Sequence, residues 1–355
     1  MPIPDRAKAF CARFNLDLPI LLAPMAGASA PTLSAAIINA GGLGSCGVLL
    51  MKPDEISDWA AAVRSLSDGP FQLNIWIPDP APVRDAGREA QVRAFLGEWG
   101  PEVPQSAGDQ TPPSFDDQCE AMLDAAPAIV SSVMGLFPDA YVHRAKARGI
   151  AWFAIVSTLA EAKAAEAAGA DVIVVQGMEA GGHRAAFDAA HAERDQVGLM
   201  ALIPAVVDAV SVPVVATGGI ADGRGVAAAL ALGASAAQIG TGFLRCPEAK
   251  IHPAWADAIG RTPPEATRLS RVFSGRAGRS VASAYVEAAT APGAPDPAPY
   301  PVQRGLTGPM RAEAGRHGDI GRMQAWAGQS AGLARVVPAL DLTRQIWNEA
   351  RSILV

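Results

Sequence analysis

One histidine in the sequence lies where a side chain could carry out proton transfer. His183 follows two glycines in the segment Gln176-Gly-Met-Glu-Ala-Gly-Gly-His-Arg184, directly after a short run of Val and Ile residues. Imidazole is the side chain whose ordinary pKa lies closest to neutral pH, so it suits general acid–base chemistry. A structural histidine is the alternative, and position alone leaves the two open. The other histidines lie in ordinary helix or loop contexts: His143, His191, His252 and His317.

Two glycine-rich turns predict a place for an anion. They are Thr217-Gly-Gly-Ile220 and Gln238-Ile-Gly-Thr-Gly242, and each follows a short apolar run. Backbone N–H groups in such turns can bind phosphate, and glycine permits the close approach that a Cβ would block. Thr241 adds a hydroxyl donor. The alternative is that these glycines only shape tight turns, but two turns of this kind in one chain favour a phosphate site.

Amide side chains offer paired donors and acceptors at the ends of two other apolar runs. Asn74 lies in Leu73-Asn-Ile-Trp76, and Gln176 opens the histidine segment. Two amides converging on one site suit a planar ring that carries several N and C=O groups. Ala23-Pro-Met25 would add an apolar wall. Either amide could instead satisfy loop backbone, and the apolar turn could be plain packing.

The elements that must position these residues alternate between strand and helix. Short apolar runs predict strands at Ile20–Ala23, Leu43–Cys46, Phe71–Trp76, Ala128–Ser131, Ile150–Ile155, Asp171–Val175, Pro213–Ala216 and Ala237–Ile239. Ala-rich stretches predict helices at Thr32–Ala40, Pro53–Leu66, Ala140–Arg148, Leu159–Ala168, Val197–Val210 and Gly223–Leu232. Continuous apolar runs are typical of strands covered on both faces.

Strand followed by helix, repeated eight times, predicts an α/β protein with a (β/α)8 TIM barrel. The alternative is a doubly wound open sheet, whose first turn should carry a G-x-G-x-x-G fingerprint. The first turn here reads Ala23-Pro-Met-Ala-Gly-Ala-Ser29, so the barrel is favoured. All the candidate residues above then lie at the C-terminal mouth of the barrel, where barrel enzymes place their active sites.

Two stretches interrupt the alternation and define the predicted domains. Residues 78–127 are rich in proline and hold an amphipathic helix at about 84–99, which indicates an insertion after the third strand. Residues 251–330 form a smaller domain inserted after the last strand, over the barrel mouth. The barrel domain is therefore predicted as residues 1–250 and 331–355, with a final helix at about 337–353 returning to its wall.

Composition narrows the classes of function. The net charge is −6, only 18% of residues are charged and 50% are apolar, which argues against disorder and against nucleic-acid binding. Leu18–Met51 carries no charge, but prolines and glycines interrupt it, so no membrane span is expected. Met1–Arg6 lacks a secretion-signal pattern, and the four cysteines show neither disulfide-like nor metal-like spacing. A reduced cytoplasmic protein without a metal is expected, and its Ala-rich helices are compatible with a homodimer.

The combined motifs resemble the nitronate monooxygenase family, formerly called 2-nitropropane dioxygenase. The resemblance runs from about residue 18 to the C-terminus and rests on five motifs: Ala23-Pro-Met-Ala-Gly27, the histidine segment 176–184, Val214-Val-Ala-Thr-Gly-Gly-Ile220, Gln238-Ile-Gly-Thr241 and Trp326-Ala-Gly-Gln329. It implies an FMN-dependent barrel with a substrate-capping domain. It also implies oxidation of alkyl nitronates, and of nitroalkanes in some members, by O₂ to a carbonyl compound and nitrite.

The same resemblance assigns roles to individual residues. His183 would be catalytic, either orienting the anionic nitronate or acting as a base toward a neutral nitroalkane, and Tyr300 would lie on the substrate side. Two positions depart from the pattern: Ala185 replaces an expected Gly, and Arg304 stands where many relatives have Asn. The residues implied to bind FMN are Ala23, Pro24, Met25, Asn74, Gln176, Gly181, Gly182, Gly218, Gly219, Gln238, Ile239, Gly240 and Thr241, with Gly219, Gly240 and Thr241 nearest the phosphate.

Two other functions remain open from the sequence. An NAD(P)H-dependent quinone reductase or enoyl-thioester reductase could share the FMN loops and the glycine-flanked histidine. A non-catalytic flavin-binding barrel would share the loops but has no need of an imidazole beside the ring. Reduction of the flavin by NADH or NADPH in the absence of O₂ separates the first of these from a nitronate oxidase.

Overall fold

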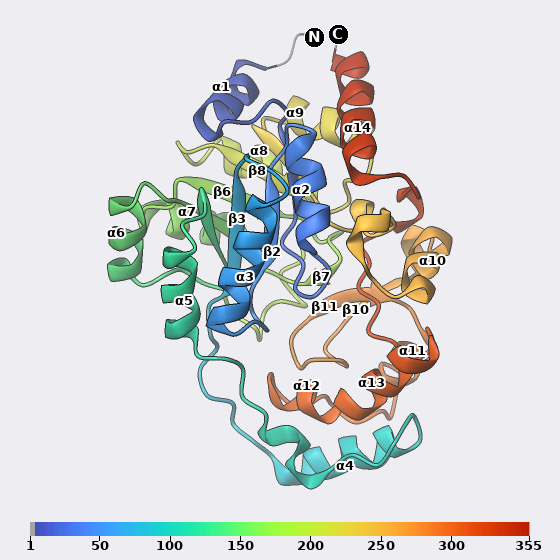
Figure 1. Cartoon of the computed structure of the whole chain (residues 1–355). Helices are drawn as coiled ribbons and strands as arrows, with labels where there is room; N and C mark the ends of the chain where they lie inside the picture. The colour runs from blue at the N-terminus through green and yellow to red at the C-terminus, as the bar shows by residue number, and fades with distance from the viewer. Residues whose placement is uncertain (1–3, 355) are drawn as a thin grey trace.

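A computed structural model describes residues 4–354 as a closed parallel barrel that carries a second, smaller layer of structure at one end (Figure 1). The strands follow the order β1-β9-β8-β6-β5-β4-β3-β2, and a parallel bridge between Leu21 and Leu43 joins the two outer strands. The barrel strands are β1 (Ile20–Leu22), β2 (Gly44–Gly47), β3 (Phe71–Trp76), β4 (Ile129–Val133), β5 (Ala151–Val156), β6 (Val172–Gln176), β8 (Val214–Thr217) and β9 (Ala236–Ile239).

This architecture confirms the predicted (β/α)8 barrel, and each predicted strand lies within three residues of an observed one. The barrel strands are almost entirely buried because helices cover their outer face and side chains fill the interior. The predicted ends of the barrel domain, Met1–Ile3 and Val355, lie outside the described residues, as does the first half of the N-terminal segment 1–6.

Eight helices follow the barrel strands, and most were predicted to within three residues. They are α2 (Pro31–Asn39), α3 (Pro53–Arg64), α5 (Phe115–Asp124), α6 (Asp139–Ala147), α7 (Leu159–Ala167), α8 (Leu199–Val207), α9 (Gly223–Ala231) and α14 (Ala339–Leu354). Local chemistry sets their ends. Thr158 and Glu161 form a capping box at the start of α7, and Gly169, with φ +91°, follows its end.

A helix that the sequence analysis did not anticipate closes the far end of the barrel. Helix α1 (Asp5–Phe14) packs Phe10 and Phe14 against Phe153 of β5, and the Phe14 and Phe153 ring centroids are 5.0 Å apart. Figure 1 places α1 and the last turns of α14 at the opposite end from the smaller layer. The aromatic cluster therefore seals the barrel interior away from the mouth.

The smaller layer contains a three-stranded antiparallel sheet that borrows one strand from the barrel. The sheet order is β10 (Thr267–Ser270), β11 (Gly278–Val281) and β7 (Gly182–His183), and β7 belongs to the loop that follows β6. The helices of this layer are α10 (Pro253–Arg261), α11 (Ala284–Ala289), α12 (Val302–Leu306) and α13 (Gly308–His317). Pairing of β7 with β11 ties the histidine segment to the cap, which the sequence pattern did not reveal.

Part of the proline-rich insertion packs on this cap. Helix α4 (Ala86–Gly97) contributes Val92 and Leu96, and the 3₁₀ turn at Gln105–Asp109 contributes Ala107, to a core shared with Tyr285 of α11. Figure 1 shows α4 beneath α12 and α13. The remainder of the predicted insertion forms α5, which packs on α3 as an ordinary barrel helix. The domain boundaries at 250/251 and 330/331 stay a prediction.

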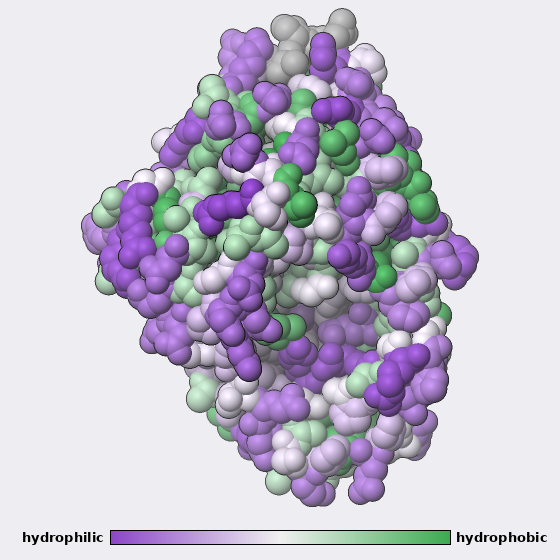
Figure 2. Space-filling model, viewed as in Figure 1, coloured by the Kyte–Doolittle hydropathy of each residue, from purple (hydrophilic) through white to green (hydrophobic). Residues whose placement is uncertain are grey.

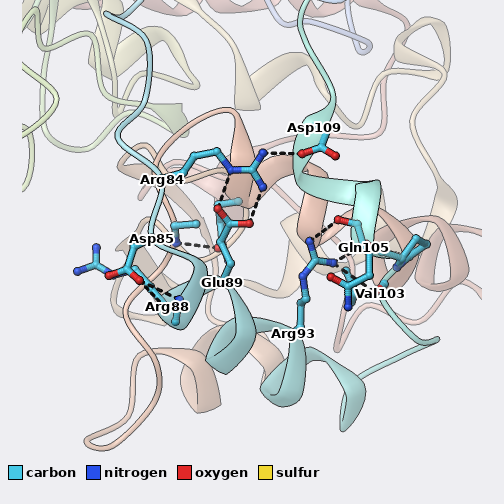
Figure 3. Close-up of polar contacts among 12 residues, drawn as sticks. Arg84, Asp85, Arg88, Glu89, Arg93, Val103, Gln105 and Asp109 are labelled. Atoms are coloured by element: carbon cyan, nitrogen blue, oxygen red, sulfur yellow. Dashed lines mark hydrogen bonds and ion pairs between the residues drawn. The ribbon is translucent and has the colours of Figure 1, made fainter.

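Charged side chains fold the insertion on itself (Figure 3). Arg84 donates from Nε and Nη2 to the two carboxylate oxygens of Glu89, at 2.7 and 2.6 Å, and it also contacts Asp109. Arg93 donates to the carbonyl oxygens of Val103 and Gln105. These contacts give the segment a defined shape despite its prolines, so it can support the cap. Among residues 4–354, no helix is long and apolar enough to cross a membrane.

Candidate active site

A pocket opens at the carboxyl ends of the barrel strands, between the barrel and the cap. The space-filling view shows a recess between these two parts, with hydrophilic residues around it (Figure 2). Nearly all the residues predicted from the sequence line this pocket: Ala23, Pro24, Met25, Asn74, Gln176, Gly181, Gly182, His183, Gly218, Gly219, Gln238, Gly240, Thr241 and Tyr300. Ile239 does not line it, because its side chain is fully buried in the barrel core.

The glycine turns form one end of the pocket. Gly218 and Gly219 have φ of +110° and +69°, a region that residues with a Cβ rarely adopt. Among the contacts of residues 4–354, the backbone amides of Gly218, Gly219, Gly240 and Thr241 donate to no protein acceptor. Unpaired amides from two adjacent turns are suited to hold an anion such as a phosphate.

Two amide side chains in the pocket have one end fixed by the barrel. Asn74 donates from Nδ2 to the carbonyl oxygen and the hydroxyl of Ser131, at 3.1 and 3.0 Å, which points its Oδ1 away as an acceptor. Gln238 accepts from Gln72 at 3.1 Å through Oε1, so its Nε2 keeps its donors. One acceptor and one donor with fixed orientation suit the edge of a heterocyclic ring.

Gln176 behaves differently from these two amides because its polar atoms hold the histidine segment. Its Nε2 donates to the carbonyl oxygen of His183 at 3.0 Å. Its Oε1 accepts from Arg184 Nη1 and from the amide of Ala185, both at 2.9 Å. The predicted cofactor contact of Gln176 stays a prediction, whereas its contacts with the segment position His183.

His183 is held by groups from the cap and from β3. Its Nε2 lies 2.7 Å from Oγ of Ser274, a buried residue in the loop between β10 and β11. The rings of Trp76 and Trp326 flank the imidazole, with centroid distances of 4.5 and 4.7 Å. Together with the β7–β11 pairing, these contacts fix the ring at the pocket wall.

The surroundings of His183 keep it neutral. Burial of the ring, with smaller effects from the positive charges of Arg276 and Arg304, lowers the pKa of His183 from 6.5 to about 3. The imidazole therefore carries no charge at neutral pH, and it can accept a proton or donate a hydrogen bond. The role of His183 toward a substrate, as a base or as the group that orients the nitronate, stays a prediction.

Several residues of the site come from segments that sequence reasoning left unassigned. Ser274, Arg276, Arg304 and Gln324 belong to the cap, and Ser274, Arg304 and Gln324 line the pocket. Arg276 forms a buried ion pair with Asp79 of the insertion, with Nη2 and Oδ1 2.9 Å apart. No motif marks Ser274, Arg276 or Gln324, and Arg304 was noticed only as a departure from a family pattern. The tertiary fold brings these cap residues to the pocket region. Trp76 and Trp326 were part of quoted motifs but had no assigned role.

Tyr300 lies beside the same aromatic wall. Its ring centroid is 5.4 Å from that of Trp76, and its buried hydroxyl has no hydrogen-bond partner within the described chain. Burial raises the pKa of the Tyr300 phenol, so the hydroxyl keeps its proton and can donate to a bound molecule. Among residues 4–354, no three His, Cys, Asp or Glu side chains gather as they would around a metal ion.

Comparisons with known proteins agree with this geometry. The family model described as nitronate monooxygenase matches residues 9–349. A nitronate monooxygenase of Paraburkholderia phytofirmans is 39% identical over 97% of this chain and 95% of its own length. The nitroalkane oxidase of Streptomyces ansochromogenes, a solved structure, superposes with a TM-score of 0.88 at 34% identity, over 97% of this chain and 100% of that one. FabK of Thermotoga maritima superposes with a TM-score of 0.75 at 28% identity, over 98% and 96%.

Proposed function

The chain belongs to the nitronate monooxygenase family, and from that premise we propose that it oxidises alkyl nitronates with O₂ to a carbonyl compound and nitrite. The observation that carries the proposal is a His183 held by Ser274, Trp76 and Trp326 at one end of a pocket whose other end is a cradle of backbone amides without a protein acceptor within residues 4–354. The cradle suits a phosphate-bearing cofactor, and the histidine faces the space that remains for a substrate.

The residues present fit FMN as that cofactor. The amides of Gly218, Gly219, Gly240 and Thr241 would receive its phosphate, and a Cβ at Gly218 would lie 3.1 Å from Cβ of Ala180. Asn74 and Gln238 offer one acceptor and one donor to the ring, and Ala23–Met25 forms an apolar wall. FMN would supply the electron chemistry, and the protein supplies binding, orientation and electrostatics.

The hydrogen bonds around His183 favour one tautomer. The Ser274 hydroxyl donates to the carbonyl oxygen of Arg276 at 3.2 Å, so its oxygen is available to accept from an Nε2–H of His183. Nδ1 then carries the lone pair. With a neutral nitroalkane, that nitrogen can take the proton from the carbon beside the nitro group. With a nitronate no proton needs to leave, and His183 has only a hydrogen-bonding role.

The aromatic residues around His183 restrict water. Trp76 and Trp326 both pack against the imidazole, and Tyr300 contacts Trp76. A partly dehydrated site strengthens hydrogen bonds and charge interactions with a small anionic substrate. The pocket thus combines a proton acceptor, a buried phenol donor and limited water access at one end.

Purified enzyme tests the proposal. We expect a yellow protein that releases FMN on denaturation and forms nitrite from propyl-2-nitronate in air. In the absence of O₂, the same nitronate should bleach the flavin, whereas NADH and NADPH should not. Rapid bleaching by a nicotinamide without nitrite formation from the nitronate would instead identify a reductase, and absence of flavin would contradict the cofactor assignment.

A further inference from the structure

Arg304 is a cation in the pocket whose guanidinium has no partner in the protein. It lies on α12 of the cap and lines the pocket together with Ser274, Tyr300 and Gln324. Within residues 4–354, its side chain takes part in no ion pair and donates no hydrogen bond. Its positive charge adds to the effect of burial that lowers the pKa of His183 and offsets part of the effect of burial that raises the pKa of Tyr300, which agrees with a position near both rings.

A second arginine, Arg311, contacts the backbone of Arg304. Arg311 of α13 donates from Nη2 to the carbonyl oxygen of Arg304 at 2.8 Å, from Nε to Thr307 at 3.0 Å, and from Nη1 to Gln324 at 3.1 Å. Burial lowers the pKa of Arg311 to about 10, so it stays charged at neutral pH. No carboxylate pairs with it in the part of the chain that the structure describes.

The charge balance near Arg304 differs from that of its neighbour Arg276. Asp79 neutralises Arg276 through a buried ion pair at 2.9 Å. Within residues 4–354, Arg304 and Arg311 have no such partner, so the cap side of the pocket has a positive charge that no carboxylate balances. A ligand that brings a negative charge would supply the missing counter-charge.

We propose that Arg304 is the anion-binding residue of this enzyme, and that its guanidinium binds the two oxygens of the nitronate group. This inference rests on the proposed function and narrows it. The planar fork of a guanidinium matches two oxygens on one atom, and charge-assisted pairs of this kind are among the stronger hydrogen bonds. Recognition of charge then belongs to Arg304, and His183 keeps the proton chemistry.

The assignment predicts a different kinetic effect for each ionic form of one substrate. Propyl-2-nitronate is an anion when it binds, whereas 2-nitropropane becomes one only as its proton leaves. Loss of Arg304 should therefore raise KM for the nitronate and lower kcat for the nitroalkane, because an interaction absent from the ground state acts on the chemical step. A purely structural arginine would shift both substrates alike.

The test compares wild type with Arg304→Gln, Arg304→Lys and the control Arg316→Gln. Arg316 lies on α13 of the same cap, is exposed and does not line the pocket, so its loss removes the same charge elsewhere. We expect Arg304→Gln to raise KM for propyl-2-nitronate by ~10–100-fold with kcat nearly unchanged, Arg304→Lys to lie between, and the control to match wild type. An unchanged KM in Arg304→Gln, or equal losses on both substrates, would overturn the assignment.

A binding measurement separates this inference from the proposed function. Nitrate is a planar anion with oxygens on one nitrogen, and isothermal titration calorimetry measures its affinity for the purified holoenzyme without turnover. We expect wild type to bind nitrate about 10-fold or more tightly than Arg304→Gln. Absence of nitrite from either substrate would reject the proposed function alone. Failure of wild type to bind nitrate, or equal affinity in both proteins, would reject the role of Arg304.

Discussion

The two ends of the pocket differ in the chemical groups that line them. At the end formed by the turns after β8 and β9, the pocket is lined by backbone amides of glycines and of Thr241 that have no protein acceptor within residues 4–354. At the other end it is lined by the side chains of His183, Ser274, Tyr300 and Arg304, most of which the cap supplies. The first end is built on the barrel turns, with one cap contact from the amide of Gly328 to Thr241 Oγ1 at 3.1 Å, and the second exists only when barrel and cap are assembled.

This difference separates binding of the cofactor from selection of the substrate. Backbone amides bind a phosphate in almost any member of such a fold, because they depend on turn shape rather than on side-chain identity. Side chains on a separate cap can change without disturbing the barrel. We therefore expect substitutions at the glycine end to affect retention of the cofactor, and substitutions at the cap end to affect the reaction and the choice of substrate.

The largest effect is expected for His183→Asn with a neutral nitroalkane. Removal of the proton acceptor should lower kcat/KM for 2-nitropropane by ~10²–10⁴-fold, because general base catalysis contributes about that much. With propyl-2-nitronate, whose proton has already left, the loss should be far smaller. Steady-state nitrite formation from both compounds gives the comparison, and flavin content serves as the control. Equal losses on the two compounds would contradict the role of His183 as a base.

Ser274→Ala should produce the next largest loss, again on the nitroalkane. The substitution leaves the ring N–H of His183 without its buried acceptor, which costs roughly 1–3 kcal/mol and should lower kcat for 2-nitropropane by ~10–100-fold. The double variant with His183→Asn should be no slower than His183→Asn alone, because Ser274 acts through the imidazole. Additive losses in that cycle would show that Ser274 has a separate role.

Gly218→Ala addresses the opposite end of the pocket. An alanine at this position would have to adopt a φ of +110°, and its Cβ would lie 3.1 Å from Cβ of Ala180. We therefore expect the turn to distort. A strain of about 1–2 kcal/mol should weaken FMN retention by ~5–30-fold, measured as flavin released on dialysis, while KM for the nitronate in the loaded fraction stays unchanged.

The matched control for that variant is Gly149→Ala. Gly149 also has a positive φ, +73°, but it lies after α6, away from the pocket, with no atom near the position of a new Cβ. Both variants should lose stability through backbone strain, yet only Gly218→Ala should lose flavin. Loss of flavin from both would show that the effect is global rather than local to the phosphate cradle.

The sequence predicted the barrel end of the pocket better than the cap end. Strand and helix periodicity located the barrel, and glycine spacing located the cradle, because both depend on residues close together in the chain. One residue of the cradle motif, Ile239, faces the core, since alternate residues of a strand point to opposite sides. Helix α1 was missed because nothing local distinguishes a helix that plugs a barrel from any other amphipathic helix.

The cap end could not be predicted from local pattern. Ser274 is far from His183 in sequence, and the β7–β11 pairing that joins their segments involves only two residues of the loop. Arg304 was noticed as a departure from a family pattern, but its missing counter-charge becomes visible only when all carboxylates near it are known in space. Charge balance is a property of the assembled pocket, and sequence spacing does not encode it.

The smallest expected effect is a flat pH profile, and it tests the environment of His183 directly. A neutral imidazole in the ordinary range would titrate near pH 6.5 and would impose a change in kcat/KM there, whereas burial and the charges of Arg276 and Arg304 move this pKa to about 3. For propyl-2-nitronate between pH 6 and 8, kcat/KM of wild type should then show no inflection that is absent from His183→Asn.

The depressed pKa of His183 also lowers the stability of the folded enzyme in acid. The unfolded chain takes up a proton at His183 below about pH 6.5 and the folded enzyme does not until about pH 3, so wild type should lose stability across that interval relative to His183→Asn. Denaturant unfolding of the two proteins at pH 7 and pH 4.5 measures this difference. A profile with an inflection near 6.5, together with equal acid sensitivity of the two proteins, would mean that the cap leaves His183 as open to water as a surface histidine, and the contrast between the two ends of the pocket would no longer hold.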